Sequence, residues 1–186
     1  MTEPPAPVDA LIEGLRLATG ALGSVADRDW STNAAGLDWT CWQTVDHLID
    51  CVFSYTLQVA GQVHGGWLAL DELHARPDAT PDQLVEALGA VGAALTALLQ
   101  TAPADLTASD GIQELDAGAW VARALHEVLL HASDVLTGLG VDFEPAPELC
   151  ELVLASPALW AIDRDRAARE SDPWSALLAG SGRATR

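Results

Sequence analysis

The chain is 186 residues long, 49% of its residues are hydrophobic, and its formal net charge is −18. A chain of this size and apolar content can bury the core of a single domain, which excludes an intrinsically disordered protein. All nine basic residues are Arg, and so large a negative charge argues against binding to nucleic acid or to an anionic membrane surface.

Helical periodicity dominates the sequence, and the alternation that is typical of strands is hard to find. The first helix is expected over about 7–26, and the breakers that follow it predict a loop over 27–38. Thr40 and Gln43 have the spacing of a capping box, in which the two side chains each accept a backbone N–H of the other residue. They predict the start of a second long helix, which continues to about Gln62.

Glycine and proline mark the boundaries in the next part of the chain. A Gly-Gly pair at 65–66 ends the second helix. Thr80 is followed by proline, the residue favoured at the first helical position, so a third helix is expected from there to about Thr101. The segment 103–116 is polar and holds an Asp-Gly turn signal at 110–111, so we expect it to be a loop.

The last third of the chain contains one more long helix and several short elements. The long helix is expected over about 117–139, with Gly140 just after its C-cap. Beyond it we expect, in order, a shorter helix at 148–155, a charged exposed stretch at 163–170 and an apolar piece that begins at Asp172.

Four long amphipathic segments with a crossover between them predict a single all-α domain, a four-helix bundle with short extra helices. Its core is expected over about 7–156 and a C-terminal helical extension over about 157–180. The remaining residues, 181–186, are expected to form a frayed tail.

The cysteines and the N-terminus indicate a cytoplasmic protein. Cys41, Cys51 and Cys150 are odd in number and form no C-x-x-C pair, so we expect neither a disulfide framework nor a thiolate zinc site. Cys41 and Cys51 are expected to be small buried hydrophobes. The N-terminus lacks the features of a secretory signal, and no apolar run reaches the roughly 18–20 residues that span a bilayer. We expect a small-molecule substrate, no nucleic-acid or membrane partner, and a monomer or homodimer.

A carboxylate and an imidazole stand out in the apolar run 120–136. Glu127 and His131 are four residues apart, so on a helix they share a face with Cβ atoms roughly 5–6 Å apart. His47 lies in another apolar run, 45–59. If the two helices face each other, two imidazoles and one carboxylate make an open site for a divalent metal. Zinc, iron and nickel all suit this donor set.

Each of these residues also has a structural interpretation. His131 alone is compatible with a core histidine bonded to a backbone carbonyl, and Glu127 with an ion pair to Arg123 on a solvated edge. His126 points about 100° away from Glu127, toward solvent or a pocket rim. Asp134 follows His131 by three residues; it either orients that imidazole, pairs with an arginine on another helix, or lies on the surface.

Seven Trp residues are spread along the chain, and most are expected to be packing anchors. Trp42, Trp67 and Trp120 lie near predicted helix ends, where they could line a pocket mouth. The two remaining histidines, His64 and His74, have exposed-looking neighbours, so structural roles are favoured for both.

Three segments resemble the motifs of a known family, in the same order along the chain. Residues 39–48 read W-T-C-W-Q-T-V-D-H-L and resemble the pattern W-[ST]-V-x-[DE]-L-V-x-H-L. Residues 127–135 read E-V-L-L-H-A-S-D-V and resemble E-x-x-x-H-x-W-D-V. Residues 172–183 read D-P-W-S-A-L-L-A-G-S-G-R and resemble D-x-x-x-L-L-x-x-x-G-R. The first pattern is that of the DinB/YfiT-like superfamily, and the other two are those of its mycothiol-dependent maleylpyruvate isomerase branch.

The resemblance implies a DinB-like four-helix bundle whose metal ligands fall on His47, Glu127 and His131. It further implies zinc or another divalent ion, and a low-molecular-weight thiol such as mycothiol as cosubstrate. We therefore expect a metal-dependent thiol transferase or isomerase. In it, Asp134 would orient a metal ligand, and Trp39, Trp42 and Arg123 would line the pocket. The alternative is a non-catalytic binding or regulatory module that holds a structural metal or none.

The sequence also departs from the branch. Gln43 replaces an acidic residue of the first pattern, and Ser133 replaces the Trp before the aspartate of the second. No segment resembles the extra C-terminal domain of the isomerase. We therefore expect a different substrate pocket, and an activity other than maleylpyruvate isomerisation itself.

Overall fold

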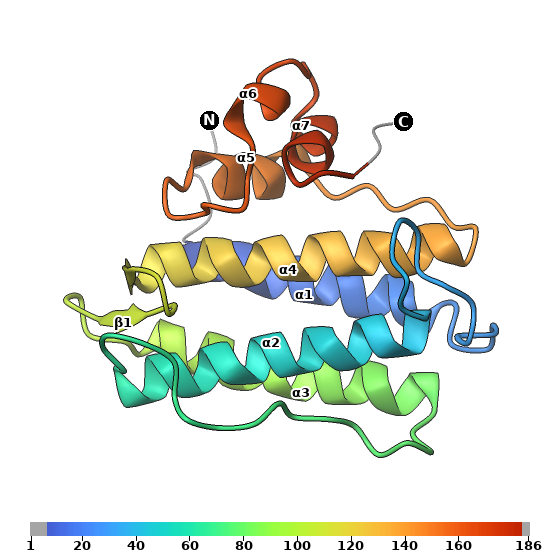
Figure 1. Cartoon of the computed structure of the whole chain (residues 1–186), viewed down its shortest axis with the longest axis horizontal. Helices are drawn as coiled ribbons and strands as arrows, with labels where there is room; N and C mark the ends of the chain where they lie inside the picture. Colours follow the sequence, from blue (N-terminus) through green and yellow to red (C-terminus); the bar gives the residue numbers. More distant parts are fainter. Residues whose placement is uncertain (1–6, 184–186) are drawn as a thin grey trace.

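The computed structural model describes residues 7–183 and contains four long helices that form a bundle. α1 pairs with α4, α2 pairs with α3, and further contacts join α1 to α3 and α2 to α4. This closes the ring around one hydrophobic core (Figure 1). The expectation of an all-α four-helix bundle is confirmed. The four helices are α1 (Pro7–Gly23), α2 (Cys41–Gly61), α3 (Pro81–Gln100) and α4 (Ala117–Gly138).

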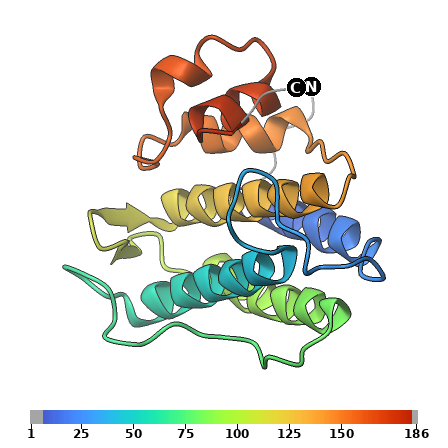
Figure 2. The ribbon, with the colours of Figure 1, turned by 45° about the vertical axis from the view of Figure 1, so that its right-hand side comes forward.

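Three short helices form a layer over the side of the bundle that holds α4. They are α5 (Pro147–Ala155), α6 (Arg164–Ala167) and α7 (Pro173–Gly180). α5 contacts both α4 and α7, and α6 packs on α7, as Figure 2 shows from the side. α4 therefore lies between two layers, which explains why polar side chains on it are buried.

The predicted helix boundaries hold where a specific cap is present. Thr40 accepts the backbone N–H of Gln43 at 3.1 Å, and the Gln43 side chain accepts the Thr40 N–H at 2.9 Å. Thr80 and Gln83 repeat the same capping box at the start of α3. Gly140 has φ of +74°, a conformation that glycine adopts without strain.

Two expectations are wrong in detail. α1 ends at Gly23 rather than near residue 26, because the N–H groups of Val25 and Ala26 bond three residues back instead of four. The segment 103–116 is not simply a loop, since β1 (Thr107–Ser109) pairs antiparallel with β2 (Glu114–Asp116). Strands of three residues offer too few positions for an alternating pattern to be recognised.

The segment between α2 and α3 is held along α2 because backbone N–H groups of the segment donate hydrogen bonds to side chains of α2. We call residues 64–79 the strap; it contains no helix or strand and runs back along α2 (Figure 1). Three polar side chains of α2 lie at spacings of four and eight residues, so they share one face of the helix. The strap N–H groups of Ala75, Leu73 and Leu68 donate to Asp46, Asp50 and Gln58 at 2.7, 2.8 and 3.0 Å.

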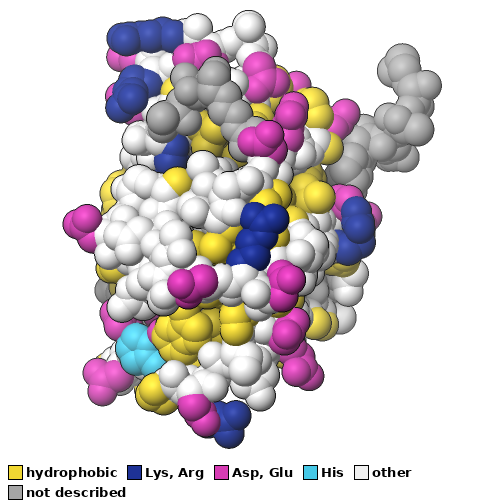
Figure 3. All heavy atoms as spheres, turned by 90° about the vertical axis from the view of Figure 1, so that its right-hand side faces the viewer, with side chains coloured by type: hydrophobic (Ala, Val, Ile, Leu, Met, Phe, Trp, Pro, Cys, Tyr) yellow, Lys and Arg dark blue, Asp and Glu magenta, His cyan; other side chains and the backbone are white. Residues whose placement is uncertain are grey.

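Among the described helices, α3 is the one whose length and composition would allow it to cross a membrane. A single helix of this kind is weak evidence for a membrane span, because core helices pass the same test. Leu84, Leu88 and Leu95 of α3 are fully buried in the bundle core. Figure 3 shows acidic side chains dispersed among hydrophobic ones on one end of the molecule rather than gathered in a patch.

Candidate metal site and pocket

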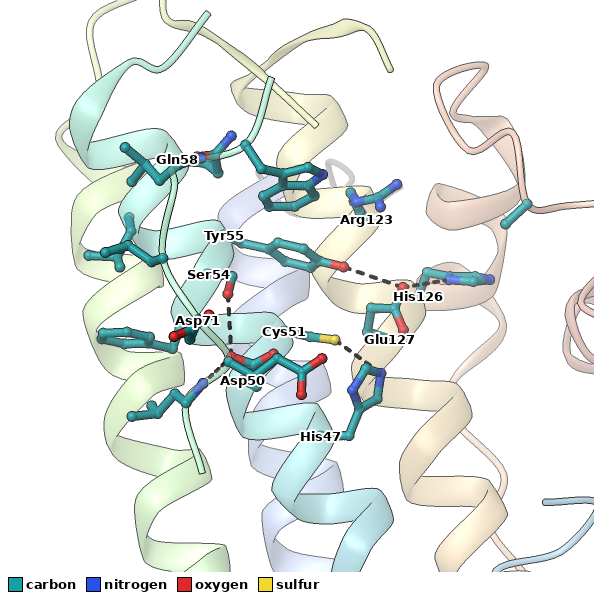
Figure 4. Close-up of a pocket in the computed structure, with 18 of the residues that line it drawn as sticks. His47, Asp50, Cys51, Ser54, Tyr55, Gln58, Asp71, Arg123, His126 and Glu127 are labelled. Atoms are coloured by element: carbon teal, nitrogen blue, oxygen red, sulfur yellow. Dashed lines mark hydrogen bonds and ion pairs between the residues drawn. The ribbon is translucent and has the colours of Figure 1, made fainter. Parts of the chain in front are cut away.

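The structure places the three predicted ligands next to one another between α2 and α4. The imidazole rings of His47 and His131 have centroids 5.4 Å apart at an interplanar angle of 85°. Nε2 of His131 lies 3.3 Å from Oε2 of Glu127. His47 and Glu127 also line the same pocket (Figure 4). Residues 80 positions apart in the sequence thus meet because α2 faces α4 in the bundle.

The donor set suits a divalent cation, but the side chains are turned toward one another. Two imidazoles and one carboxylate are the ligands of many catalytic zinc sites. Among residues 7–183, no group of three or more His, Cys, Asp or Glu side chains stands in the geometry of a metal site. Nε2 of His47 lies 3.4 Å from the sulfur of Cys51, while His131 faces Glu127. The three residues therefore suit a divalent cation by donor type and by proximity, but their ligating atoms do not stand in the geometry of a metal site.

Electrostatics give the two histidines different protonation states. Burial lowers the pKa of His131, but the carboxylates of Asp134 and Glu127 outweigh it and raise that pKa to about 9. Burial and the charge of His131 both lower the pKa of His47, so its imidazole is neutral and can donate a lone pair. Cation binding at His131 would displace a proton, as at other histidine metal ligands.

Glu127 stays ionised although its side chain is only 21% exposed. Burial opposes its charge, but hydrogen bonds and charges from His126 and His131 hold its pKa well below the usual range. The Tyr55 hydroxyl donates to Oε1 of Glu127 at 3.4 Å, and Nδ1 of His126 lies 3.7 Å from the same oxygen. Burial raises the pKa of Tyr55 well above its ordinary value, so the hydroxyl keeps its proton and remains a donor.

A pocket of about 870 Å³ opens beside the three residues. Its walls come from α2, α4, the strap and the segment that follows α5, and they are mainly aromatic and aliphatic, with carboxylates on the α2 and strap side (Figure 4). Pockets of this size, with a few convergent polar groups, are typical of small-molecule sites. The aromatic and polar side chains that line the pocket include Tyr55, Trp67, Asp71, Arg123, His126 and Trp160.

Arg123 lines this pocket but does not pair with Glu127. Its Nη1 lies 3.2 Å from Oδ2 of Asp110, whose side chain is fully buried, and its guanidinium stands 5.4 Å from the centre of the Tyr55 ring. Nε of Arg123 is buried without a hydrogen-bond partner. The guanidinium of Arg123 is thus fixed at the pocket wall, and its Nε–H group can still donate a hydrogen bond.

Trp39 and Trp42 line a second pocket, of about 960 Å³, which shares His47 with the first. The Trp39 ring contacts His47 edge-on at 4.9 Å, and Nε1 of Trp42 donates to the carbonyl of Ala79 at 2.8 Å. Trp67 lies at the first pocket, as expected for a mouth residue. Trp120 does not line either pocket; it is fully buried, and its ring lies 5.4 Å from that of Tyr55 on α2.

Asp134 contacts both His131 and an arginine, but that arginine follows α7 and does not lie on a helix. Its Oδ2 lies 3.3 Å from Nδ1 of His131, which is otherwise buried without a well-aligned hydrogen-bond partner. The guanidinium of Arg183 donates to both oxygens of Asp134, at 3.1 and 2.7 Å. Asp134 is 4% exposed, so it is not a surface residue.

Two features of the site were missed. Cys51 was expected to be a small buried hydrophobe, but it is half-buried at the pocket with its sulfur beside His47, and burial raises the pKa of its thiol so that the thiol stays protonated. Its spacing of four residues from His47 was a usable signal. Residues 181–183 do not fray, since Ser181 and Arg183 contact His126 and Asp134; residues 184–186 lie outside the described part.

His64 and His74 have the structural roles that were expected. Nδ1 of His64 lies 2.8 Å from Glu114, and Nδ1 of His74 lies 2.9 Å from Asp46. His126, by contrast, is only 6% exposed and lies at the pocket rather than in solvent.

Comparison with known proteins gives one match. A family model described as the DinB superfamily matches residues 10–135, more than half of the chain. The matched part spans the four bundle helices and includes all three candidate ligands and Asp134, but it ends before α5. No curated protein and no solved structure matches the chain significantly.

Proposed function

The chain belongs to the DinB superfamily, and on that premise we propose that it is a divalent-metal-dependent thiol transferase or isomerase acting on a small electrophile. The observation that carries the proposal is the meeting of His47, Glu127 and His131 beside a pocket of about 870 Å³. These three residues would hold the cation, with zinc as the first choice. A thiol of the mycothiol type, a cytoplasmic location and a small-molecule partner belong to the same proposal.

A bound divalent cation would lower the pKa of a coordinated thiol, so that the thiol reacts as its thiolate. The thiol proton would pass to solvent when the cation binds the sulfur, and the thiolate would then form a bond to a carbon of the electrophile. On a halide substrate, the halide would depart with the bonding electron pair. On an activated alkene, the neighbouring carbon would take up a proton, which completes conjugation. If the adduct instead rotates about its new single bond before it is protonated and then loses the thiolate, the double bond re-forms and the alkene is isomerised.

The protein side chains supply binding and orientation. The strap and the aromatic walls shield the reacting atoms from water, which strengthens electrostatic interactions in the site. The Tyr55 hydroxyl holds the Glu127 carboxylate, and Asp134 holds His131 from the opposite side of its ring. Trp39, packed against His47, and Arg123, fixed by Asp110, limit where a ligand can lie.

The second candidate is a non-catalytic binding or regulatory module. It is favoured by one observation: His131 stands between two carboxylates, each 3.3 Å from one of its ring nitrogens, so the charges of the cluster are balanced without a metal cation. Such a module would use the pocket to bind a ligand without transforming it.

Elemental analysis of the wild type and of His131→Ala, paired with a thiol-conjugation assay, tests the proposal. We expect about one zinc per wild-type chain, loss of most of it in His131→Ala, and conjugation of mycothiol or N-acetylcysteine to 1-chloro-2,4-dinitrobenzene by the wild type alone. His64→Ala is the matched control, because its side chain is exposed and pairs with Glu114 away from the site.

Equal zinc in the wild type and in His131→Ala would remove His131 from the site. Stoichiometric metal without thiol-dependent turnover of any electrophile tried would favour the binding module. Each of these outcomes contradicts a different part of the proposal.

A further inference from the structure

We propose that residues 181–183, at the end of the C-terminal extension, position the two candidate ligands on α4. Arg183 positions His131 through Asp134, and Ser181 positions Glu127 through His126. This inference rests on the proposed metal site. It concerns residues outside the part of the chain that the DinB model matches, which ends at residue 135.

The first contact runs from Arg183 to His131. The guanidinium approaches Asp134 with two nitrogens, Nε at 3.1 Å and Nη2 at 2.7 Å, one on each carboxylate oxygen. A bidentate contact of this kind fixes the plane of the carboxylate as well as its position. Because Oδ2 of Asp134 lies 3.3 Å from Nδ1 of His131, the orientation of Asp134 determines where the imidazole presents its other nitrogen.

The second contact runs from Ser181 to Glu127. Oγ of Ser181 lies 3.1 Å from Nε2 of His126, and Nδ1 of His126 lies 3.7 Å from Oε1 of Glu127. His126 is therefore held on one side by the extension while its other nitrogen faces the carboxylate. Two residues of the extension, two positions apart, thus reach the neighbours of both candidate ligands on α4.

The local backbone explains how these side chains are held in place. α7 ends in a Schellman motif: the N–H of Gly182 donates to the carbonyl of Ala179 at 3.1 Å, and the N–H of Arg183 to that of Leu178 at 2.8 Å. Gly182 has φ of +79°, as the position after the C-cap requires. In the Ser-Gly-Arg sequence, the glycine therefore ends α7, and the arginine after it is directed back onto α4.

Burial makes the Arg183 contact an internal one. Asp134 is 4% exposed, and the Arg183 side chain is 24% exposed. A buried carboxylate without its cationic partner is strongly destabilised in that position. Without Arg183, Asp134 would turn toward another donor or toward water, and His131 would lose the group that orients it.

Zinc affinity, measured by competition with a chromophoric chelator, tests the inference. We expect Arg183→Met to bind zinc about 10–100-fold more weakly than the wild type, as is typical when a group behind a metal ligand is removed. Arg183→Lys should lose less, because it keeps the charge without the bidentate fork. Ser181→Ala should lose a few-fold, because one uncharged contact is removed.

The matched control is Arg164→Met in the same extension. The Arg164 guanidinium donates to the carbonyls of Leu154 and Ser156 and does not touch the site. A purely structural role would lower the melting temperature of both arginine variants and leave zinc affinity unchanged. The absorption spectrum of bound Co²⁺ adds a second readout, since it should change in Arg183→Met and stay the same in Arg164→Met.

A double variant isolates the route through Asp134. If Arg183 acts by holding Asp134, then adding Arg183→Met to Asp134→Asn should weaken zinc binding no further. Wild-type zinc affinity in Arg183→Met, measured beside a weakened Asp134→Asn, would overturn the inference and leave the proposed function intact. A wild type that binds no zinc would overturn both.

Discussion

Helices α3 and α4 are alike in length and apolar character, yet the structure buries them differently. Of the 22 residues of α4, 15 are buried, whereas α3 has 6 buried among 20. The reason is position, since α4 lies between the bundle and the α5–α7 layer, and α3 packs on α1 and α2 at the opposite side.

The buried polar groups of the two helices also differ in where their hydrogen-bond partners lie. Thr96 of α3 donates to the carbonyls of Gly92 and Ala93 in its own helix, at 3.0 and 3.1 Å. On α4, Asp134 is paired with an arginine 49 residues away, and His126 with Ser181, 55 residues away. Polar groups that need partners from other elements are expensive to bury, at about 1–3 kcal/mol each when unpaired. On α4 these groups surround the candidate ligands Glu127 and His131.

The largest expected effect tests whether the apolar packing of the two helices is nonetheless equal. Leu129→Ala on α4 and Leu95→Ala on α3 each remove a fully buried side chain. Each should lower the free energy of unfolding by about 2–5 kcal/mol, as measured by urea denaturation. A much smaller loss for Leu95→Ala would show that the outer helix closes around the cavity and is packed more loosely than α4.

The next effect concerns the ion pair at the start of α4. Arg123→Met leaves the Asp110 carboxylate buried with only the backbone N–H groups of Ile112 and Gln113, so we expect a loss of about 2 kcal/mol. The control is Arg76→Met, whose pair with Asp78 is exposed and should contribute less than about 0.5 kcal/mol. Equal losses of the free energy of unfolding in urea titrations of the two variants would contradict this expectation. They would mean that a buried pair between two elements stabilises the fold no more than an exposed local pair.

A smaller effect is expected on α3. Thr96→Val keeps the shape of the side chain and removes a hydroxyl whose acceptor carbonyls belong to the same helix. The free energy of unfolding should fall by about 1 kcal/mol or less. A loss above about 2 kcal/mol in the same denaturation assay would mean that α3 also depends on its buried polar group.

The smallest effect involves the pair between His74, an exposed residue of the strap, and Asp46 of α2. The hydrogen bond and the charge of Asp46 raise the pKa of His74 above 6.5, so the pair stabilises the fold below that pH and loses its contribution as the pH rises through the folded-state pKa. Thermal melts of wild type and His74→Asn should therefore differ at about pH 5.5 and converge by about pH 8.5. A difference that is independent of pH would assign the contact to packing instead.

The bundle could be predicted from the sequence because its signals are local. Thr40 with Gln43, Thr80 with its proline, and Gly140 each act within one helical turn, and the structure confirms all three. The hairpin at 107–116 could not be predicted, because its strands are three residues long and are stabilised by tertiary contacts.

The candidate site divides in the same way. The spacing of Glu127 and His131 indicates a shared helix face, and Cys51 stands in the same relation to His47. The contact between His47 and His131 depends on which faces of α2 and α4 meet, and the contact of Arg183 with Asp134 depends on the path of the chain between these two residues, which are 49 positions apart. No periodic pattern in the sequence encodes either of them.

The attachment of the strap bears on how such a pocket can diverge. Three side chains of α2, those of Asp46, Asp50 and Gln58, accept hydrogen bonds from the main chain of the strap. The strap side chain of His74 adds one contact to Asp46. Trp67, Leu70 and Asp71 line the pocket yet take no part in those anchors through their side chains. Substitutions of Leu70 and Asp71 would therefore change the wall of the pocket and leave the main-chain hydrogen bonds of the strap in place.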